Sequence, residues 1–155
     1  CHYDTNNRTF FQILADGDVK FLIKEGGTDI AQLITDRKLR DVSAWFHLVI
    51  AIDTTQSTDT NRIKLYINGA EANTLAAVSG INQTINFASM FGFLGFAQNF
   101  SENRKWDGLI DEVGIFNATL TQAQVTSIYN ATTTGKTTDL SDLTTPPIKW
   151  YRMGD

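Results

Sequence analysis

The sequence predicts an all-β protein, a sandwich or a barrel, and three observations carry this prediction. Short runs rich in β-branched and aromatic residues recur along the chain, and several alternate between apolar and polar positions. Turn residues, including Asp-Gly and Asn-Gly pairs, separate these runs. Only the segment 121–129 has the spacing of an amphipathic helix. This combination is typical of sheet layers that close over one apolar core.

The first predicted hairpin joins residues 10–14 (FFQIL) to residues 19–24 (VKFLIK). The second of these runs alternates in the period of a strand. Asp16 and Gly17 lie between the two runs and favour a two-residue hairpin turn. The sequence EGG at 25–27 is expected to end the second strand.

Residues 44–53 (AWFHLVIAID) form the strongest predicted strand. Apolar side chains occupy its even-numbered and its odd-numbered positions alike, so both faces are expected to be buried in the middle of the sandwich. A polar loop, 54–61, separates it from residues 62–69 (RIKLYING), whose alternation predicts a strand with one solvated face. Asn68 and Gly69 form the strongest hairpin signal, because both central positions of such a turn require positive φ.

The second half of the chain predicts two weaker strands within residues 81–96 and a last strand over 107–116. The helix then begins after Thr121, with Gln124 three residues later in a capping-box arrangement. Its apolar face is expected to contain Val125, Ile128 and Tyr129. We interpret residues 1–131 as one domain and the Thr-rich segment 132–155 as a linker or tail that leads to a further element.

Composition excludes several functional classes. The formal charge is −4 and the isoelectric point is about 5.1, and the basic residues are scattered, so we expect no nucleic-acid partner. No apolar run approaches the roughly 20 residues that cross a bilayer, so we expect no membrane insertion. Cys1 is the single cysteine, so an internal disulfide or a cysteine-rich zinc site cannot form.

Two stretches resemble the laminin-G-like, concanavalin A-like domains. Residues 44–72 resemble the central strand pair of that family, with its marks at Trp45, His47, Asn68 and Gly69. Residues 106–131 resemble its closing strand and short helix, with marks at Gly108, Ile110, Asp111, Glu112, Val113, Ile115, Phe116 and Leu120. The resemblance implies a two-sheet antiparallel β-sandwich (jelly roll) with one short C-terminal helix and an extended tail. A fold of this kind hosts many activities.

The chain departs from the family pattern at its beginning. Family members carry further strands ahead of the first hairpin, and this chain starts close to it, so the domain is expected to lack its first strands. Such a sandwich has an unpaired sheet edge, so we expect either that the sequence is a fragment of a longer protein or that another chain supplies the missing strands.

Residues 51–69 are similar to versions found in bacteriophage tail-fibre and other virion structural proteins, and WYRMGD at 150–155 is similar to junction segments of phage virion proteins. This resemblance implies a structural or adhesion module of a virion that presents loops to host glycans or to neighbouring subunits. The alternative is a secreted, extracellular, calcium-dependent lectin-like domain.

Catalysis is not expected. Glycosidases of this fold carry the pattern Glu-x-Asp-x-x-Glu, and none of the four glutamates, Glu25, Glu71, Glu102 and Glu112, lies in it. Asp111 and Glu112 are adjacent, so on a strand they point to opposite faces. His47 has no nucleophile motif to serve and is interpreted as structural. Asp111 is expected to share a strand face with Val113 and Ile115. Its partly buried carboxylate would then accept hydrogen bonds from backbone amides or bind a cation.

Two segments are candidate binding sites. Residues 98–107 combine an aromatic ring with groups that bond hydroxyls, which predicts a carbohydrate site; the alternative is that the tryptophan packs as core. Its members are Gln98, Asn99, Asn103, Arg104 and Trp106. Calcium is the plausible metal, because the chain offers oxygen ligands and little else. Asp53, Asp59 and Asn61 around the polar loop are its candidate ligands, although solvated loop acids look the same in sequence.

Overall fold

A computed structural model describes residues 6, 8–41, 43–72, 74–79, 96–98, 103–105, 108–131 and 139–153. In chain order its elements are β1 (Arg8–Ile13), β2 (Val19–Glu25), β3 (Thr28–Thr35), β4 (Leu48–Ile52), β5 (Ile63–Ile67), β6 (Ala70–Glu71), β7 (Thr74–Ser79), β8 (Phe96–Gln98), β9 (Asn103–Lys105), β10 (Val113–Ile115), α1 (Gln122–Ala131) and β11 (Lys149–Tyr151), with the short 3-10 helices η1 (Asp59–Asn61) and η3 (Leu140–Asp142). The prediction of a mainly β protein with one short helix is confirmed.

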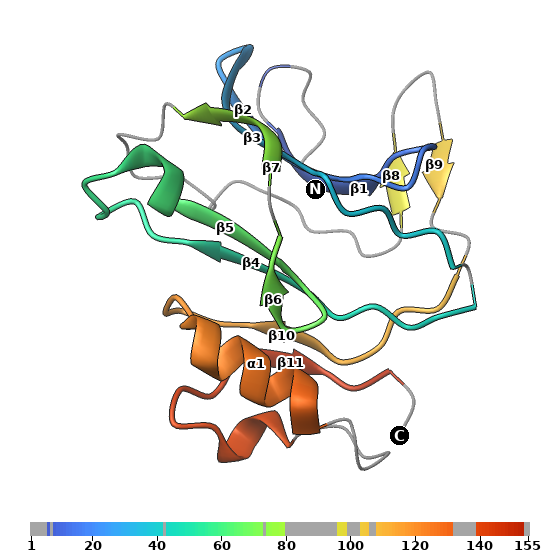
Figure 1. Ribbon diagram of the computed structural model, residues 1–155, viewed down its shortest axis with the longest axis vertical. Coiled ribbons are helices and arrows are strands. Elements are labelled where there is room, and N and C mark those ends of the chain that lie inside the picture. Colours follow the sequence, from blue (N-terminus) through green and yellow to red (C-terminus); the bar gives the residue numbers. More distant parts are fainter. Residues whose placement is uncertain are drawn as a thin grey trace.

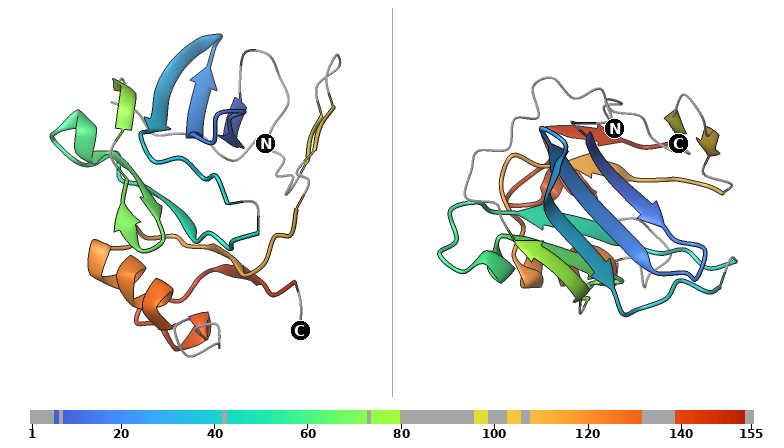
Figure 2. Two further views of the ribbon diagram at one scale, coloured as in Figure 1. Left: turned by 45° about the vertical axis from the view of Figure 1, so that its right-hand side comes forward. Right: turned by 90° about the horizontal axis from the view of Figure 1, so that it is seen from above.

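The described strands form several small antiparallel sheets. One has the order β1-β2-β3-β7, a second has the order β4-β5-β6, and β8-β9 and β10-β11 are two-stranded ribbons. The first two sheets lie one above the other, and α1 and the β10-β11 ribbon form a further layer below them (Figures 1 and 2). The middle sheet therefore has protein on both of its faces.

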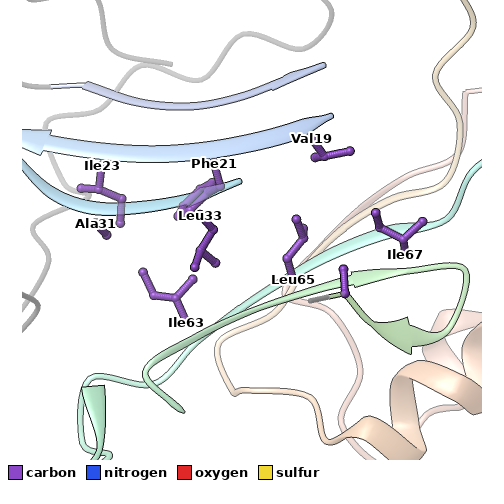
Figure 3. Close-up of a cluster of buried hydrophobic side chains, with 9 residues drawn as sticks. Val19, Phe21, Ile23, Ala31, Leu33, Ile63, Leu65 and Ile67 are labelled. Carbon is purple, nitrogen blue, oxygen red and sulfur yellow. The ribbon is translucent and has the colours of Figure 1, made fainter. Parts of the chain in front are cut away.

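The first apolar core fills the space between the two larger sheets. Alternate residues of β2 and β3 point toward alternate residues of β5, as Figure 3 shows. The buried members of this core are Val19, Phe21, Ile23, Ala31, Leu33, Ile63, Leu65, Ile67 and Ala72. Face-to-face packing of inward residues from two sheets is the interaction that stabilises a sandwich.

A second core lies on the opposite face of the middle sheet. Tyr66 and Ala51 pack there with Val125 and Ile128 of α1. The predicted strand 44–53, buried on both faces, is confirmed only in part: β4 begins at Leu48, Ala51 is its one buried residue, the other four are half-buried, and Trp45 before it is 64% exposed. β4 also lies at the edge of the order β4-β5-β6, and β5 is the central strand. The predicted solvated face of β5 is wrong at Tyr66, which is buried because α1 covers it.

Of the two predicted two-residue hairpin turns, the structure contains one. Asn68 and Gly69 have φ of 51° and 77° and join β5 directly to β6, which confirms the predicted two-residue hairpin. Asp16 and Gly17 do not form such a turn: only Gly17 has positive φ, and Ile13 pairs with Val19, so a longer loop connects β1 to β2. The Gly17 amide donates to the Leu14 carbonyl at 2.9 Å, closing the loop.

The helix begins as predicted. The Thr121 amide donates to the Gln124 Oε1 at 2.8 Å, and the Gln124 amide donates back to the Thr121 Oγ1 at 3.3 Å, so the capping box is confirmed. The side chains of Gln122 and Thr126 both donate to the Gly69 carbonyl oxygen, at 2.6 and 2.8 Å. These bonds fix α1 against the β5-β6 turn.

The C-terminal segment differs from the expected extended tail in its described part. Residues 139–153 fold back on the body: β11 pairs with β10, and Leu140 is buried in the second core with Trp150 packed against it. Apolar burial and strand pairing hold this segment in place. The division of the chain into domains at residue 131 stays a prediction.

No helix in the described ranges is long and apolar enough to cross a membrane.

Two further strand predictions have other outcomes. The predicted last strand, 107–116, is shorter than expected, because β10 begins at Val113 and Glu112 before it has a φ of 52°. The predicted strands within 81–96 lie outside the described residues, apart from Phe96 in β8. In the described sheet β1 pairs only with β2 and so lies at an edge.

Candidate functional site

The predicted carbohydrate residues lie on or near the β8-β9 ribbon. The register pairs Gln98 with Asn103 and Ala97 with Arg104, so the sequence positions chosen for the site do meet across one hairpin. Asn99 and Trp106 lie outside the described residues. The carbohydrate site therefore stays a prediction, with a backbone arrangement that brings three of its five positions together.

The predicted calcium ligands lie around the loop between β4 and β5. The Asp53 carboxylate accepts hydrogen bonds from the Thr55 amide at 3.0 Å and from the Gln56 Nε2 at 2.7 Å. Bonds from the Thr55 hydroxyl and from Gln56 lower the pKa of Asp53. Asn61 is exposed and ends η1. Asp59 starts the same turn.

The geometry of this loop shows how Asp53 is used. Its carboxylate is satisfied by loop donors rather than by sharing an ion with other acids. Nowhere in the described ranges do three or more histidine, cysteine, aspartate or glutamate side chains gather as metal ligands would. The calcium hypothesis stays a prediction.

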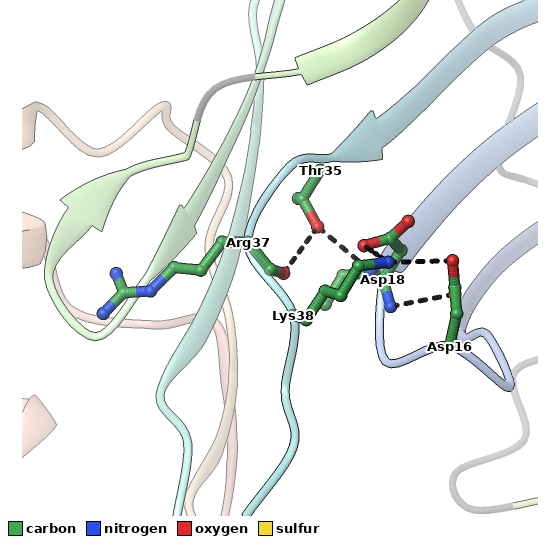
Figure 4. A network of polar contacts seen from close by, with 6 residues as sticks. Asp16, Asp18, Thr35, Arg37 and Lys38 are labelled. Carbon is green, nitrogen blue, oxygen red and sulfur yellow. Dashed lines mark hydrogen bonds and ion pairs between the residues drawn. The ribbon is translucent and has the colours of Figure 1, made fainter.

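A polar network holds the β1-β2 loop to the segment that follows β3 (Figure 4). The Lys38 ammonium contacts the Asp16 Oδ2 at 2.9 Å and the Asp18 Oδ1 at 3.0 Å, and Asp18 is buried. The hydrogen bond to Asp16 raises the pKa of Lys38, and the same bond lowers the pKa of Asp16. The Lys38 ammonium thus joins both acidic side chains of the β1-β2 loop to the segment after β3, which is a structural use of its charge.

Thr35 connects the same network to the core. It is fully buried, and its hydroxyl oxygen accepts from the Val19 amide at 3.0 Å while the hydroxyl donates to the Arg37 carbonyl at 3.0 Å. Arg37 in turn donates from its guanidinium to the Ile67 carbonyl at 3.2 Å, which joins the two sheets. A buried hydroxyl with both donor and acceptor roles satisfied costs little to bury.

His47 lies beside the helix rather than at a reactive centre. Its ring stacks on Tyr129 with centroids 6.0 Å apart, and its amide donates to the Asn68 Oδ1 at 2.9 Å. Within the part of the chain that the structure describes, its buried Nδ1 has no hydrogen-bond partner. Burial lowers the pKa of His47 below 6.5, because an imidazolium would lose its hydration there. These contacts agree with the structural interpretation of this histidine.

This environment makes stability depend on pH through His47. The folded state disfavours the protonated ring, while the unfolded chain binds a proton as the pH falls below about 6.5. The contribution of the neutral ring is therefore complete above pH 6.5 and is lost as the pH falls through the lower folded-state pKa. We expect the midpoint of thermal unfolding to decrease from pH 7.5 to pH 5, and less so in His47→Phe, which keeps the stacking on Tyr129.

Comparing the wild-type protein with His47→Phe isolates the contribution of His47 to the pH dependence of stability. His2 is present in both proteins, and the aspartates with lowered pKa have folded-state pKa values below 3.8, outside the range tested. Equal pH dependence of the wild-type protein and His47→Phe between pH 7.5 and 5 would contradict the assignment.

The segment before β10 is joined to the C-terminal strand by side chains. The Trp150 Nε1 donates to the Glu112 Oε2 at 2.6 Å, and the Arg152 guanidinium lies 4.9 Å from the centre of the Trp150 ring. Asp111 does not share a strand face with Val113, as was expected; it is exposed and accepts from the amides of Glu112 and Met153 at 2.9 and 3.2 Å. The expectation failed because the left-handed Glu112 interrupts the strand.

The sequence did not predict this contact between the segment before β10 and the C-terminal strand β11. The only local signal is the alternation in KWYR after the two prolines at 146 and 147, which is compatible with a short strand. Nothing in that alternation identifies β10 as its partner.

The described carboxyl groups with shifted pKa values all shift in one direction. Hydrogen bonds from side chains or backbone lower the pKa of Asp16, Asp41, Asp53 and Asp139. The general acid of a glycosidase needs the opposite shift, because it must hold a proton near neutral pH.

Two sheets that face each other across a common apolar core, with a short helix beneath the second, define a protein of the β-sandwich class. The chain belongs to the Concanavalin A-like lectin/glucanases superfamily, whose sequence profile matches residues 2–126. The match confirms the resemblance at the level of this superfamily. Comparison with curated proteins and comparison with solved structures found no match.

Proposed function

We propose that the chain is a non-catalytic carbohydrate-binding module. The observation that carries this proposal is membership of a superfamily of lectins and glucanases over residues 2–126. The β8-β9 ribbon supports it, because it places Gln98 directly opposite Asn103, and both are residue types that bond sugar hydroxyls. The lectin-like branch is favoured over the glucanase-like branch because none of the four glutamates lies in the pattern Glu-x-Asp-x-x-Glu.

Within this function we propose a structural and adhesion role in a virion, on a fibre, tail or capsid surface. The support is the similarity of residues 51–69 and 150–155 to phage virion proteins, together with the position of β1 at a sheet edge that another subunit can extend. A mass measurement in solution tests the second point. Assembly through β1 predicts oligomers that a proline at Phe11 disrupts, and a monomer at all concentrations would count against it.

Substitution of Trp106 by alanine tests the carbohydrate site. We expect Trp106→Ala to weaken glycan binding about tenfold with little change in thermal stability, because an exposed aromatic plate supplies much of the contact with a sugar ring. Titration of the whole chain against the glycans that an array selects gives the affinities. Trp45, which is 64% exposed and lies before β4, provides the matched control.

The outcomes separate the alternatives. If Trp45→Ala weakens binding and Trp106→Ala does not, the site is not at the ribbon. If Trp106→Ala unfolds the protein, the tryptophan is core and the prediction is wrong. Binding that disappears with EDTA would instead favour the calcium-dependent lectin. Sugars released from a panel of polysaccharides, detected by mass analysis, would overturn the non-catalytic assignment.

A further inference from the structure

The β10-β11 ribbon has two different faces. Its register pairs Val113 with Tyr151, Gly114 with Trp150 and Ile115 with Lys149. Trp150 packs toward the second core, and a side chain at Gly114 would meet Phe116 and Leu140, so these two positions face inward. Because side chains alternate along a strand, the neighbouring positions face outward.

The outward face is unusually apolar for a surface. Ile115 is 48% exposed and Tyr151 is 47% exposed, and Leu109, Ile148 and Met153 flank them. Five of the seven exposed large hydrophobic residues in the described ranges thus lie on this ribbon or beside it. A cluster of this kind on an otherwise acidic, polar protein indicates a contact surface.

The backbone that carries Tyr151 is held on both sides of it. Trp150 is fixed by its 2.6 Å hydrogen bond to Glu112, and the Arg152 guanidinium lies over the Trp150 ring and within 3.6 Å of the Glu112 carboxylate. The Met153 amide is bonded to Asp111. A ring presented by a rigid backbone loses little entropy when it binds a ligand.

Two exposed charged residues of opposite sign lie near Tyr151 along the chain or through a backbone contact. Lys149 precedes Tyr151 by two residues, so the two share one strand face about 7 Å apart. Lys149 is exposed, and its side-chain ammonium has no hydrogen-bond or ion-pair partner in the described structure. Asp111 is exposed and accepts from the amide of Met153, two residues after Tyr151.

We propose that this outer face binds a pyranose that carries a carboxylate, such as a hexuronate or a sialic acid unit of a glycan. The apolar face of the sugar stacks on Tyr151, its carboxylate pairs with Lys149, and its hydroxyls donate to Asp111. A neutral sugar leaves Lys149 without a counter-charge, so charge complementarity selects the acidic one. This inference rests on the proposed function in that the ligand is a glycan, but it places a second subsite away from the β8-β9 ribbon.

Titration calorimetry with the whole chain tests the proposal. The probes are trigalacturonate and sialyllactose, each compared with its neutral counterpart, galactotriose or lactose. We expect the acidic member of at least one pair to bind about fivefold more tightly, the ratio typical of an exposed ion pair. Lys149→Gln removes the preference, Tyr151→Ala weakens both members about tenfold, and Arg40→Gln, an exposed cation elsewhere, changes neither.

Three results would overturn the proposal: equal affinity for both members of each pair, a preference that survives Lys149→Gln, or a change of oligomeric state in Tyr151→Ala, which would mark the face as a contact between copies. Neutral-glycan binding that is lost in Trp106→Ala and kept in Tyr151→Ala refutes the second subsite and leaves the proposed function standing. Absence of binding to any glycan removes both.

Discussion

Replacing Leu65 by alanine is expected to lower the free energy of unfolding by about 3 kcal/mol, within the usual range of about 2 to 5 kcal/mol for such a change in a core. Leu65 is 1% exposed and lies at the centre of β5, where its side chain points into the space between the two larger sheets (Figure 3). The loss includes the transfer free energy of three carbon atoms, the Cγ and its two methyl groups, and the cost of the cavity that remains.

The cavity contribution is expected to be large at this position. Leu65 faces Phe21 and Leu33 of the opposite sheet, and strand pairing holds both sheets at a fixed spacing, so neighbours cannot move in to fill the gap. Urea unfolding followed by circular dichroism measures the change.

An exposed leucine provides the control. Leu109 is 77% exposed, so Leu109→Ala removes the same atoms from a surface and is expected to change the free energy of unfolding by less than about 0.5 kcal/mol. Similar losses for the two variants would mean that the two sheets do not pack over a common core as described.

The parts of the fold that the sequence predicts best are those that local chemistry determines. The capping box at Thr121 and Gln124 needs only residues three apart, and the Asn68-Gly69 turn needs only two residues that tolerate positive φ. The alternation in β5 predicts its core face for the same reason. Each of these features is complete within a few residues of the chain.

The features that were missed depend on partners distant in the sequence. The sequence predicts a solvated Tyr66 because Lys64 and Asn68, two residues away on the same strand face, are polar. Only the docking of α1, about sixty residues later, buries it. β11 is three residues long, so its pairing with β10 leaves almost no local pattern. β3 was also missed, although its start was signalled: Gly26 and Gly27 both have positive φ and join β2 to β3 as a two-residue turn.

The candidate sites show the same limit. Composition selected residues 98–107 as a carbohydrate-binding segment, and that remains a prediction although the structure pairs Gln98 with Asn103 across the β8-β9 ribbon. Composition also selected Asp53 as a possible ligand, but the same residue type, followed by a threonine, forms a loop turn on its own. Which role an acidic residue takes depends on the groups that the fold brings to it, and Lys149 beside Tyr151 on an outward face could be identified only once β11 was placed.

Gly69→Ala is the second substitution for which a large loss is expected, again about 3 kcal/mol. Two costs add at this position. Its φ of 77° is unfavourable for any residue with a Cβ, which costs about 1 kcal/mol. The new Cβ would also lie 2.8 Å from the Tyr129 Cδ1 and 3.0 Å from the Tyr129 Cβ, so α1 must shift or the Tyr129 ring must rotate, at about 1 to 3 kcal/mol.

Gly26 separates the two costs. Its φ is 55°, and nothing lies within 4 Å of a Cβ built on it, so Gly26→Ala has the conformational cost alone, about 1 kcal/mol. The difference between the two variants in urea unfolding therefore measures the steric part. In a Tyr129→Ala background the ring is gone and only the contact with the Cβ of residue 129 remains, so Gly69→Ala should cost less than in the wild-type protein and approach the cost of Gly26→Ala. If the full loss persisted there, the close packing of α1 on the β5-β6 turn, which positions the helix beneath the middle sheet, would not be its cause.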